Sequence, residues 1–280
     1  MHGKSKAFAI LAGLTGLWCV TVLHGQEHRP EVYLFGVVPQ FGARQLADSW
    51  VPILDELEKR SGHKFKLAGS ARIPDFEQEF QAGRFDFAYM NPYHVLQAAQ
   101  SQGYVPLVRD RIPVRGILVV RRDSAIRTVQ DLAGQTIAFP SPNAMGASLM
   151  VRADLARKFG LQFEARFVQS HSSVYLSVAK ALTTGGGGVK KSFDAQPEAV
   201  QSQLRILYTT QAVPAHPIVA HRRIPSAVRE RVRAALLAMD RTAEGRVLLA
   251  AVPIDGLVPA ASKDYKSVTE LGLDRFTVRE

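Results

Sequence analysis

Short apolar segments alternate with amphipathic segments along most of this chain, from residue 31 onwards. The apolar segments have the length of buried strands, and each ends at Pro, Gly or a polar residue. The segments between them repeat apolar residues every three or four positions, which is the period of a helix that buries one face. Strands and helices that alternate in this way build βαβ units, so we predict an α/β protein with mixed, mostly parallel sheets flanked by helices.

The alternation falls into two sets, and the second interrupts the first. The first set has expected strands at 31–39, 64–70, 85–92, 104–109 and 115–122, with helices at 44–62, 73–83 and 93–103. The second has expected strands at 131–139 and 163–169, with helices within 138–160 and at 170–188. Strands at 204–210 and 216–223 and a helix at 224–240 then follow. We therefore expect two lobes: lobe 1 at 26–121 with 212–280, and an inserted lobe 2 at 122–211.

Residues 1–25 are typical of a secretory signal peptide. Two lysines precede an uncharged apolar run at 7–23, and the small residue Gly25 follows it. Cleavage near Gly25 predicts a periplasmic protein. The run is short for a transmembrane helix, but an uncleaved membrane anchor stays open. Lipid attachment at Cys19 is disfavoured because the bulky Trp18 precedes it.

Removal of this leader takes away two lysines and no acidic residue, so the formal charge falls from +10 to +8. It also removes the single cysteine, which leaves no disulfide, thiolate nucleophile or thiolate metal ligand. The remaining basic residues are scattered, without the aromatic and basic module of an RNA or single-strand binder. We expect the positive charge to attract small anions, and we expect no nucleic acid partner.

Polar side chains follow several of the predicted strands at the point where each strand ends. Ligands of open α/β sheets bind at the carboxyl ends of strands, and in two facing lobes these clusters would line one cleft. The candidate ligand-binding residues in these clusters are Tyr89, Asn91, Tyr93, Ser141, Asn143, Ala144, Met145, Gly146, His171, Ser172 and Ser173. A further candidate, His216, rests on the resemblance given below.

Two of these clusters are expected helix starts, where free backbone N–H groups and the helix dipole favour an anion. The first is "SPNAMGAS" at 141–148, where Gly146 permits close backbone approach. The second is "SHSS" at 170–173. Ordinary helix capping by the serines or by Asn143 is the alternative in each case. Tyr89 is either a neutral donor to an oxyanion or a packing residue.

The run "GGGGVKKS" at 185–192 is not a phosphate loop, because Val189 separates the glycines from Lys190 and no strand is expected before it. We predict a helix stop and a flexible turn there. Lys190 and Lys191 remain available to add positive charge to a cleft.

No pattern in the sequence indicates a catalytic or metal site. A metal site needs three or four convergent ligands, and neither His216 nor His221 belongs to an H-E-x-x-H motif. The segment "GASLM" is not a G-x-S-x-G nucleophile elbow. We expect no enzyme, metal or cofactor. A hydrolase on the same scaffold is the least supported alternative.

Four segments carry a resemblance to a known family. They are "FGVVPQFGARQLADSWVPILDELEKRSG", "FEQEFQAGRFDFAYMNPYHVLQAA", "SAIRTVQDLAGQTIAFPSP" and "LYTTQAVPAHPIVAHRRIP". The chain resembles the phosphate/phosphite/phosphonate-type periplasmic substrate-binding proteins of ABC transporters. The resemblance implies a two-lobed type II periplasmic binding protein that closes on its ligand by a hinge. It implies capture of a phosphorus oxyanion for an importer with an ABC permease in the inner membrane. Sensing for a histidine kinase is the alternative, and we expect a monomer.

The resemblance also implies site residues. The family's strand-end tyrosine falls on Tyr89, and its anion loop falls on 141–148. Here Asn-Ala-Met-Gly replaces the usual Ser-Thr-Ser-Gly, so backbone donors remain while hydroxyl donors are lost. The acids that hold an ammonium group in aminophosphonate binders correspond to Ser172 and His216. This implies a plain oxyanion (phosphate, phosphite or a simple phosphonate) with His216 or His171 as a donor.

Overall fold

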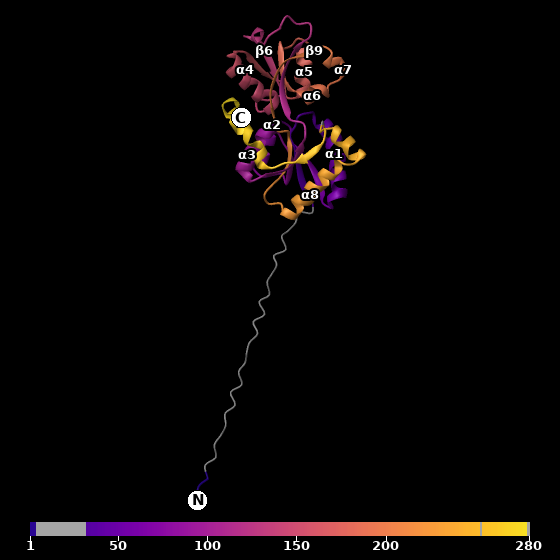
Figure 1. Ribbon diagram of the computed structural model, residues 1–280, viewed down its shortest axis with the longest axis vertical. Coiled ribbons are helices and arrows are strands. Elements are labelled where there is room, and N and C mark those ends of the chain that lie inside the picture. Colours follow the sequence, from indigo (N-terminus) through magenta and orange to yellow (C-terminus); the bar gives the residue numbers. More distant parts are fainter. Residues whose placement is uncertain (4–31, 253, 279–280) are drawn as a thin grey trace. The chain divides into compact units, whose positions relative to one another are not determined.

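The computed structural model describes residues 1–3, 32–252 and 254–278 (Figure 1). The predicted leader beyond residue 3 and its cleavage site lie outside these described residues. The chain divides into the units 1–30 and 31–280, and the described helices and strands all belong to the second unit. Among the described residues, no helix is long and apolar enough to cross a membrane.

The first sheet has the strand order β11-β4-β10-β3-β1-β2. Its strands are β1 (Val32–Val37), β2 (Lys64–Gly69), β3 (Phe87–Tyr89), β4 (Val105–Asp110), β10 (Pro217–Ala220) and β11 (Leu257–Pro259). β1 runs parallel to β2 and β3, whereas β10 is antiparallel to both β3 and β4, and β11 is antiparallel to β4. The sheet is mixed, as predicted, but it has fewer parallel pairs than expected because β10 and β11 pair with their neighbours in antiparallel orientation.

The helices associated with the first sheet are α1 (Ala43–Ser61), α2 (Ile73–Gln81), α3 (Pro92–Gln102), α8 (Ser226–Met239), α9 (Ala243–Ala250) and α10 (Lys266–Glu270), with the 3₁₀ turns η3 (Ser262–Tyr265) and η4 (Leu273–Phe276). α1 buries the face predicted from its period, including Trp50 and Leu57. It ends at Gly62, whose φ of 71° needs a residue without a side chain. The side chain of Asn91 caps α3 by accepting the His94 N–H.

The second sheet has the strand order β7-β6-β8-β5-β9. Its strands are β5 (Val114–Arg121), β6 (Thr136–Phe139), β7 (Glu164–Phe167), β8 (Gly185–Val189) and β9 (Leu204–Val213). Its helical elements are η1 (Gln130–Leu132), η2 (Met145–Met150), α4 (Val151–Phe159), α5 (His171–Ala179), α6 (Lys190–Asp194) and α7 (Glu198–Gln201). Figure 1 shows α4, α5, α6 and α7 grouped around the second sheet, and α1, α3 and α8 around the first.

The expected lobe boundary at residue 121 does not match the sheets. β5 pairs with β8 and β9 in the second sheet, although it lies in the range expected for lobe 1. β8 and β9, which belong to the inserted part of the chain, pair with β5 on its two sides in antiparallel orientation. β5 is therefore a strand of their sheet. The chain therefore crosses between the sheets twice, at 111–113 and at 214–216.

The four glycines form a strand, so the predicted helix stop and turn at this place were wrong. α5 ends at Ala179, and β8 runs between β5 and β6 in the sheet. A Cβ atom on Gly187 would overlap the Ala147 carbonyl oxygen, and one on Gly188 would overlap the Tyr175 hydroxyl. Glycine is needed here because η2 and α5 approach β8 closely from its two faces.

Candidate ligand-binding site

A small cavity of about 20 Å³ lies where several strands of the two sheets end. It is lined by residues that follow β1, β3 and β6, by the first residue of α5 and by the residue before β10. The lining residues are Val38, Gln40, Ile73, Asn91, Ala144, Met145, Gly146, Ala147, His171, Val189 and His216. This cavity thus brings together Asn91, His171 and the segment 144–146, which follow predicted strands, with His216, which precedes β10.

One wall of the small cavity is the start of a continuous helical run. η2 is a π-helical stretch, in which the Leu149 N–H donates to the Ala144 carbonyl at 3.1 Å, and α4 continues it to residue 159. The first N–H groups of a helix have no partner within the helix, and the helix dipole adds partial positive charge there. No Lys or Arg is among the described residues that line this cavity.

His216 is a buried residue that also lines the small cavity. Its Nε2 atom lies 3.1 Å from the side-chain nitrogen of Gln40. An amide nitrogen only donates, so in this arrangement His216 Nε2 accepts and the ring is neutral. Burial, with smaller contributions from the nearby His94, His171 and Lys191, lowers the pKa of His216 to about 3.

His171 is the second buried imidazole at this cavity. Its Nδ1 atom lies 3.0 Å from the Ser192 hydroxyl, which in turn lies 2.8 Å from the hydroxyl of Tyr175. Burial lowers the pKa of His171 to about 4. Both imidazoles are therefore neutral near pH 7, and each ring carries one N–H group.

A larger cavity of about 290 Å³ adjoins the small one and shares Gln40, Val189 and His216 with it. Its other lining residues are Phe41, Tyr89, Ile112, Pro113, Val114, Arg115, Lys190, Lys191, Ser192, Asp194, Val252 and Asp255. The ring of Tyr89 lies 5.4 Å from that of His216, and burial raises the pKa of the Tyr89 hydroxyl, which stays protonated. Tyr89 thus belongs to the large cavity.

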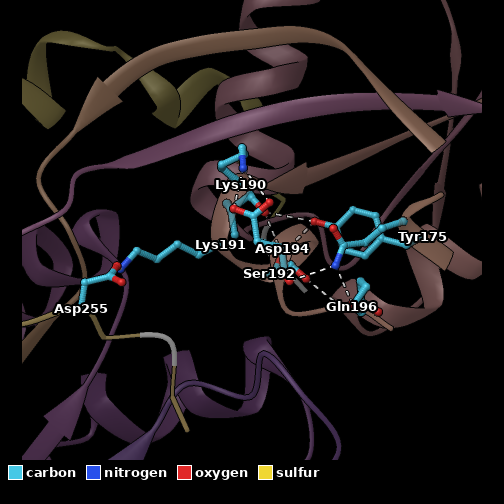
Figure 2. A network of polar contacts seen from close by, with 9 residues as sticks. Tyr175, Lys190, Lys191, Ser192, Asp194, Gln196 and Asp255 are labelled. Carbon is cyan, nitrogen blue, oxygen red and sulfur yellow. Dashed lines mark hydrogen bonds and ion pairs between the residues drawn. The ribbon is translucent and has the colours of Figure 1, made fainter. Parts of the chain in front are cut away.

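An ion bridge joins the two sheets beside the large cavity. Lys191 of α6 contacts the carboxylates of Asp110, at the end of β4, and of Asp255. Figure 2 shows the Lys191 side chain extended from α6 towards Asp255, while Lys190 pairs with Asp194 within the helix. The side chain of Asp110 is only 5% exposed, so Lys191 neutralises a buried charge.

A second link between the sheets runs through Glu77 of α2. Its carboxylate lies 2.9 Å from His94 Nε2 and accepts from the Asn143 side chain at 3.0 Å. Asn143 also exchanges two hydrogen bonds with the backbone of Val278 near the C-terminus. The side chain of Asn143 is therefore occupied in joining three segments and does not line either cavity.

The other candidate residues also lie away from the two cavities. The Tyr93 hydroxyl donates to Asp274 at 2.6 Å beside a separate surface cavity. Ser170 caps α5 by accepting the Ser173 N–H, as the capping alternative predicted, and neither Ser172 nor Ser173 lines a described cavity. The Ser141 hydroxyl is buried, without a hydrogen-bond partner among the described residues.

The site includes residues that were missed from the sequence. Gln40 follows the first strand directly, so the strand-end argument had a signal for it. Val189 had none, because it ends a strand of glycines that lacks any side-chain pattern. Among the described residues, no group of three His, Cys, Asp or Glu side chains is arranged to hold a metal ion.

Two α/β sheets joined by two crossings, with strand ends and helix starts around a shared cavity, define a periplasmic-binding-protein type of fold. The sequence pattern of the family described as "ABC transporter, phosphonate, periplasmic substrate-binding protein" matches residues 35–265. The chain belongs to this family.

Individual relatives agree with this assignment. The chain is 22% identical over 268 residues to the phosphonates-binding periplasmic protein of Escherichia coli (strain K12), covering 88% of this chain and 78% of that protein. The fold matches PhnD1 from Prochlorococcus marinus, solved with methylphosphonate, with a TM-score of 0.81 and 16% identity over 89% of this chain and 100% of that one. It also matches a binding protein component of an ABC phosphonate transporter from Pseudomonas aeruginosa, with a TM-score of 0.76 and 17% identity over 86% and 85% of the two chains.

Proposed function

We propose that this protein captures a phosphorus oxyanion (phosphate, phosphite or a simple phosphonate) in the small cavity and delivers it to an ABC importer, binding it without turnover. The observation that carries the proposal is the convergence of the η2 helix start and two neutral imidazoles, His171 and His216, on one space. Free backbone N–H groups and imidazole N–H groups are suitable donors to oxyanion oxygens.

The small cavity must enlarge to admit such a ligand. A volume of about 20 Å³ holds about one water molecule. We propose that the two lobes open about the crossings at 111–113 and 214–216, with the lobes defined by the two sheets. Since Gln40 and Asn91 follow strands of the first sheet and η2 belongs to the second, opening would move these two walls of the cavity apart.

The charge of the cavity supports an oxyanion that is held mainly by neutral donors. None of the described residues that line the small cavity is cationic, and Lys191 is already paired with two carboxylates. A site of this kind loses little affinity as salt rises, because few screened surface charges contribute. We propose that the partner is a permease of the inner membrane and that the leader at 1–25 exports the protein to the periplasm.

A thermal-shift series tests the proposal. The protein is unfolded, dialysed and refolded to remove any ligand acquired during expression, then melted with phosphate, phosphite, methylphosphonate or sulfate. Binding to the native state at a hundredfold excess over Kd adds ~2.7 kcal/mol of stability. We expect a selective rise in melting temperature with at least one phosphorus oxyanion and none with sulfate. No rise with any phosphorus oxyanion would contradict the proposal.

A further inference from the structure

The large cavity is a second compartment next to the proposed anion site. Gln40, Val189 and His216 line both spaces, so a ligand held in the small cavity faces the large one. An inorganic oxyanion would leave the large cavity unused. The volume of about 290 Å³ is ample for an organic group, since a cavity of roughly 150 Å³ takes up benzene.

The inner surface of this compartment is mostly apolar. The rings of Phe41 and Tyr89 and the side chains of Ile112, Val114 and Val252 contribute to it. Such surfaces bind hydrocarbon groups by removing them from water.

The charges around the compartment are largely compensated within the protein. Lys190 pairs with Asp194, and Lys191 bridges Asp110 and Asp255. A charged substituent beside Lys190 or Lys191 would have to compete with one of these pairs. Arg115, also on the lining, is exposed to solvent. An uncharged substituent makes the best use of this space.

We infer that the preferred ligand is an organophosphonate with an uncharged, apolar substituent. The phosphonate group occupies the small cavity, and the substituent lies in the large cavity against Tyr89, Phe41 and Ile112. This inference rests on the proposed function and selects one class from the oxyanions named there.

Calorimetric titration with a homologous series tests it. Methyl-, ethyl-, propyl- and phenylphosphonate share one head group and differ in apolar area. We expect Kd to fall about fourfold with each added methylene, with phenylphosphonate tighter than methylphosphonate. Equal or weakening affinity from methyl to phenyl, with methylphosphonate still bound, would overturn the inference and leave the proposed function intact. Failure of all four ligands and of phosphate and phosphite would overturn both.

A matched pair of variants tests whether the substituent lies in the large cavity. Ile112→Asn places a polar amide on the lining of the large cavity, at a side chain that is already 44% exposed. Leu182→Asn makes the same change at an exposed site away from both cavities. The ratio of the methylphosphonate Kd to the propylphosphonate Kd should be roughly tenfold or more in the native protein and in Leu182→Asn, and several-fold smaller in Ile112→Asn. The same ratio in both variants would contradict the placement.

Discussion

The imidazole of His216 stacks on the phenol ring of Tyr89, with ring centroids 5.4 Å apart and planes inclined by 24°. Tyr89 also contacts the indole of Trp50 in α1, with centroids 4.9 Å apart. Since His216 lines both cavities, this row of three rings connects the candidate site to the interior of the first sheet's core.

Trp50 should therefore report ligand binding. A ligand that contacts His216 shifts the stacked pair and alters the environment of the indole. We expect a saturable change in tryptophan fluorescence when methylphosphonate is added to the protein without its leader, in which Trp50 is the only tryptophan. Trp50→Phe should remove the signal. Unchanged fluorescence in a sample whose calorimetry shows binding would disprove this connection.

The buried imidazoles should make the protein less stable in mild acid. The pKa values of His171 and His216 are lowered to about 4 and about 3 in the folded state, against ~6.5 when unfolded. Below pH 6.5 the unfolded chain takes up protons that the folded chain does not. The free energy of unfolding then falls by up to ~1.4 kcal/mol per pH unit for each histidine, and the effect is absent above about pH 7.

Urea unfolding at pH 7 and at pH 5 measures this dependence. Carboxylates also titrate in this range, so the comparison is made with His216→Gln, which lacks one of the two groups. We expect the loss of stability between pH 7 and pH 5 to be about 2 kcal/mol smaller in the variant. An equal loss in both proteins would show that His216 is not held neutral by burial.

The glycines of β8 should differ sharply in their tolerance of a methyl group. Gly187→Ala drives a Cβ into the Ala147 carbonyl, whereas at Gly185 the nearest atom, on Leu132, lies 3.4 Å away. We expect Gly187→Ala to lower the free energy of unfolding by about 2–3 kcal/mol and Gly185→Ala by less than about 1 kcal/mol. Denaturant unfolding of the two variants measures these losses. Similar losses of unfolding free energy in both variants would argue against the close packing of η2 on β8.

The bridge from Lys191 should stabilise the protein mainly through Asp110. Lys191→Met leaves the buried Asp110 carboxylate without its cation, and we expect a loss of about 2–4 kcal/mol. Asp255→Asn removes a partner whose side chain is 61% exposed, at a cost below about 1 kcal/mol. Thermal or denaturant unfolding of the two variants measures both losses of stability. A larger loss for Asp255→Asn would reverse this assignment.

Much of the fold could be predicted because its signals are local. α1 was expected at 44–62 and runs from Ala43 to Ser61, since its apolar period and its terminal glycine lie within the segment itself. β8 could not be predicted, because glycine carries no side chain to form a pattern. Its strand conformation depends on pairing with β5 and β6, which come from other parts of the chain.

Some residues of the candidate site could likewise be predicted from the sequence, and others could not. The rule that ligands bind at strand ends predicted Asn91 and His171, and the family resemblance predicted His216; all three line one cavity. The same rule failed for Tyr93 and for Asn143. The Tyr93 side chain bonds to Asp274, and the Asn143 side chain bonds to the backbone of Val278. Both partners lie in the C-terminal segment more than a hundred residues away, and no local pattern indicates such contacts.

The central claim is that a phosphorus oxyanion binds in the small cavity with His216 as a donor. Calorimetric titration of methylphosphonate into ligand-free native protein and into His216→Phe tests it most directly. Phenylalanine keeps a ring against Tyr89 but has no nitrogen to donate. We predict one bound equivalent in the native protein and an affinity at least about tenfold weaker in the variant, as expected for a lost hydrogen bond to a charged ligand. No binding to the native protein, or equal affinity in both, would contradict the claim.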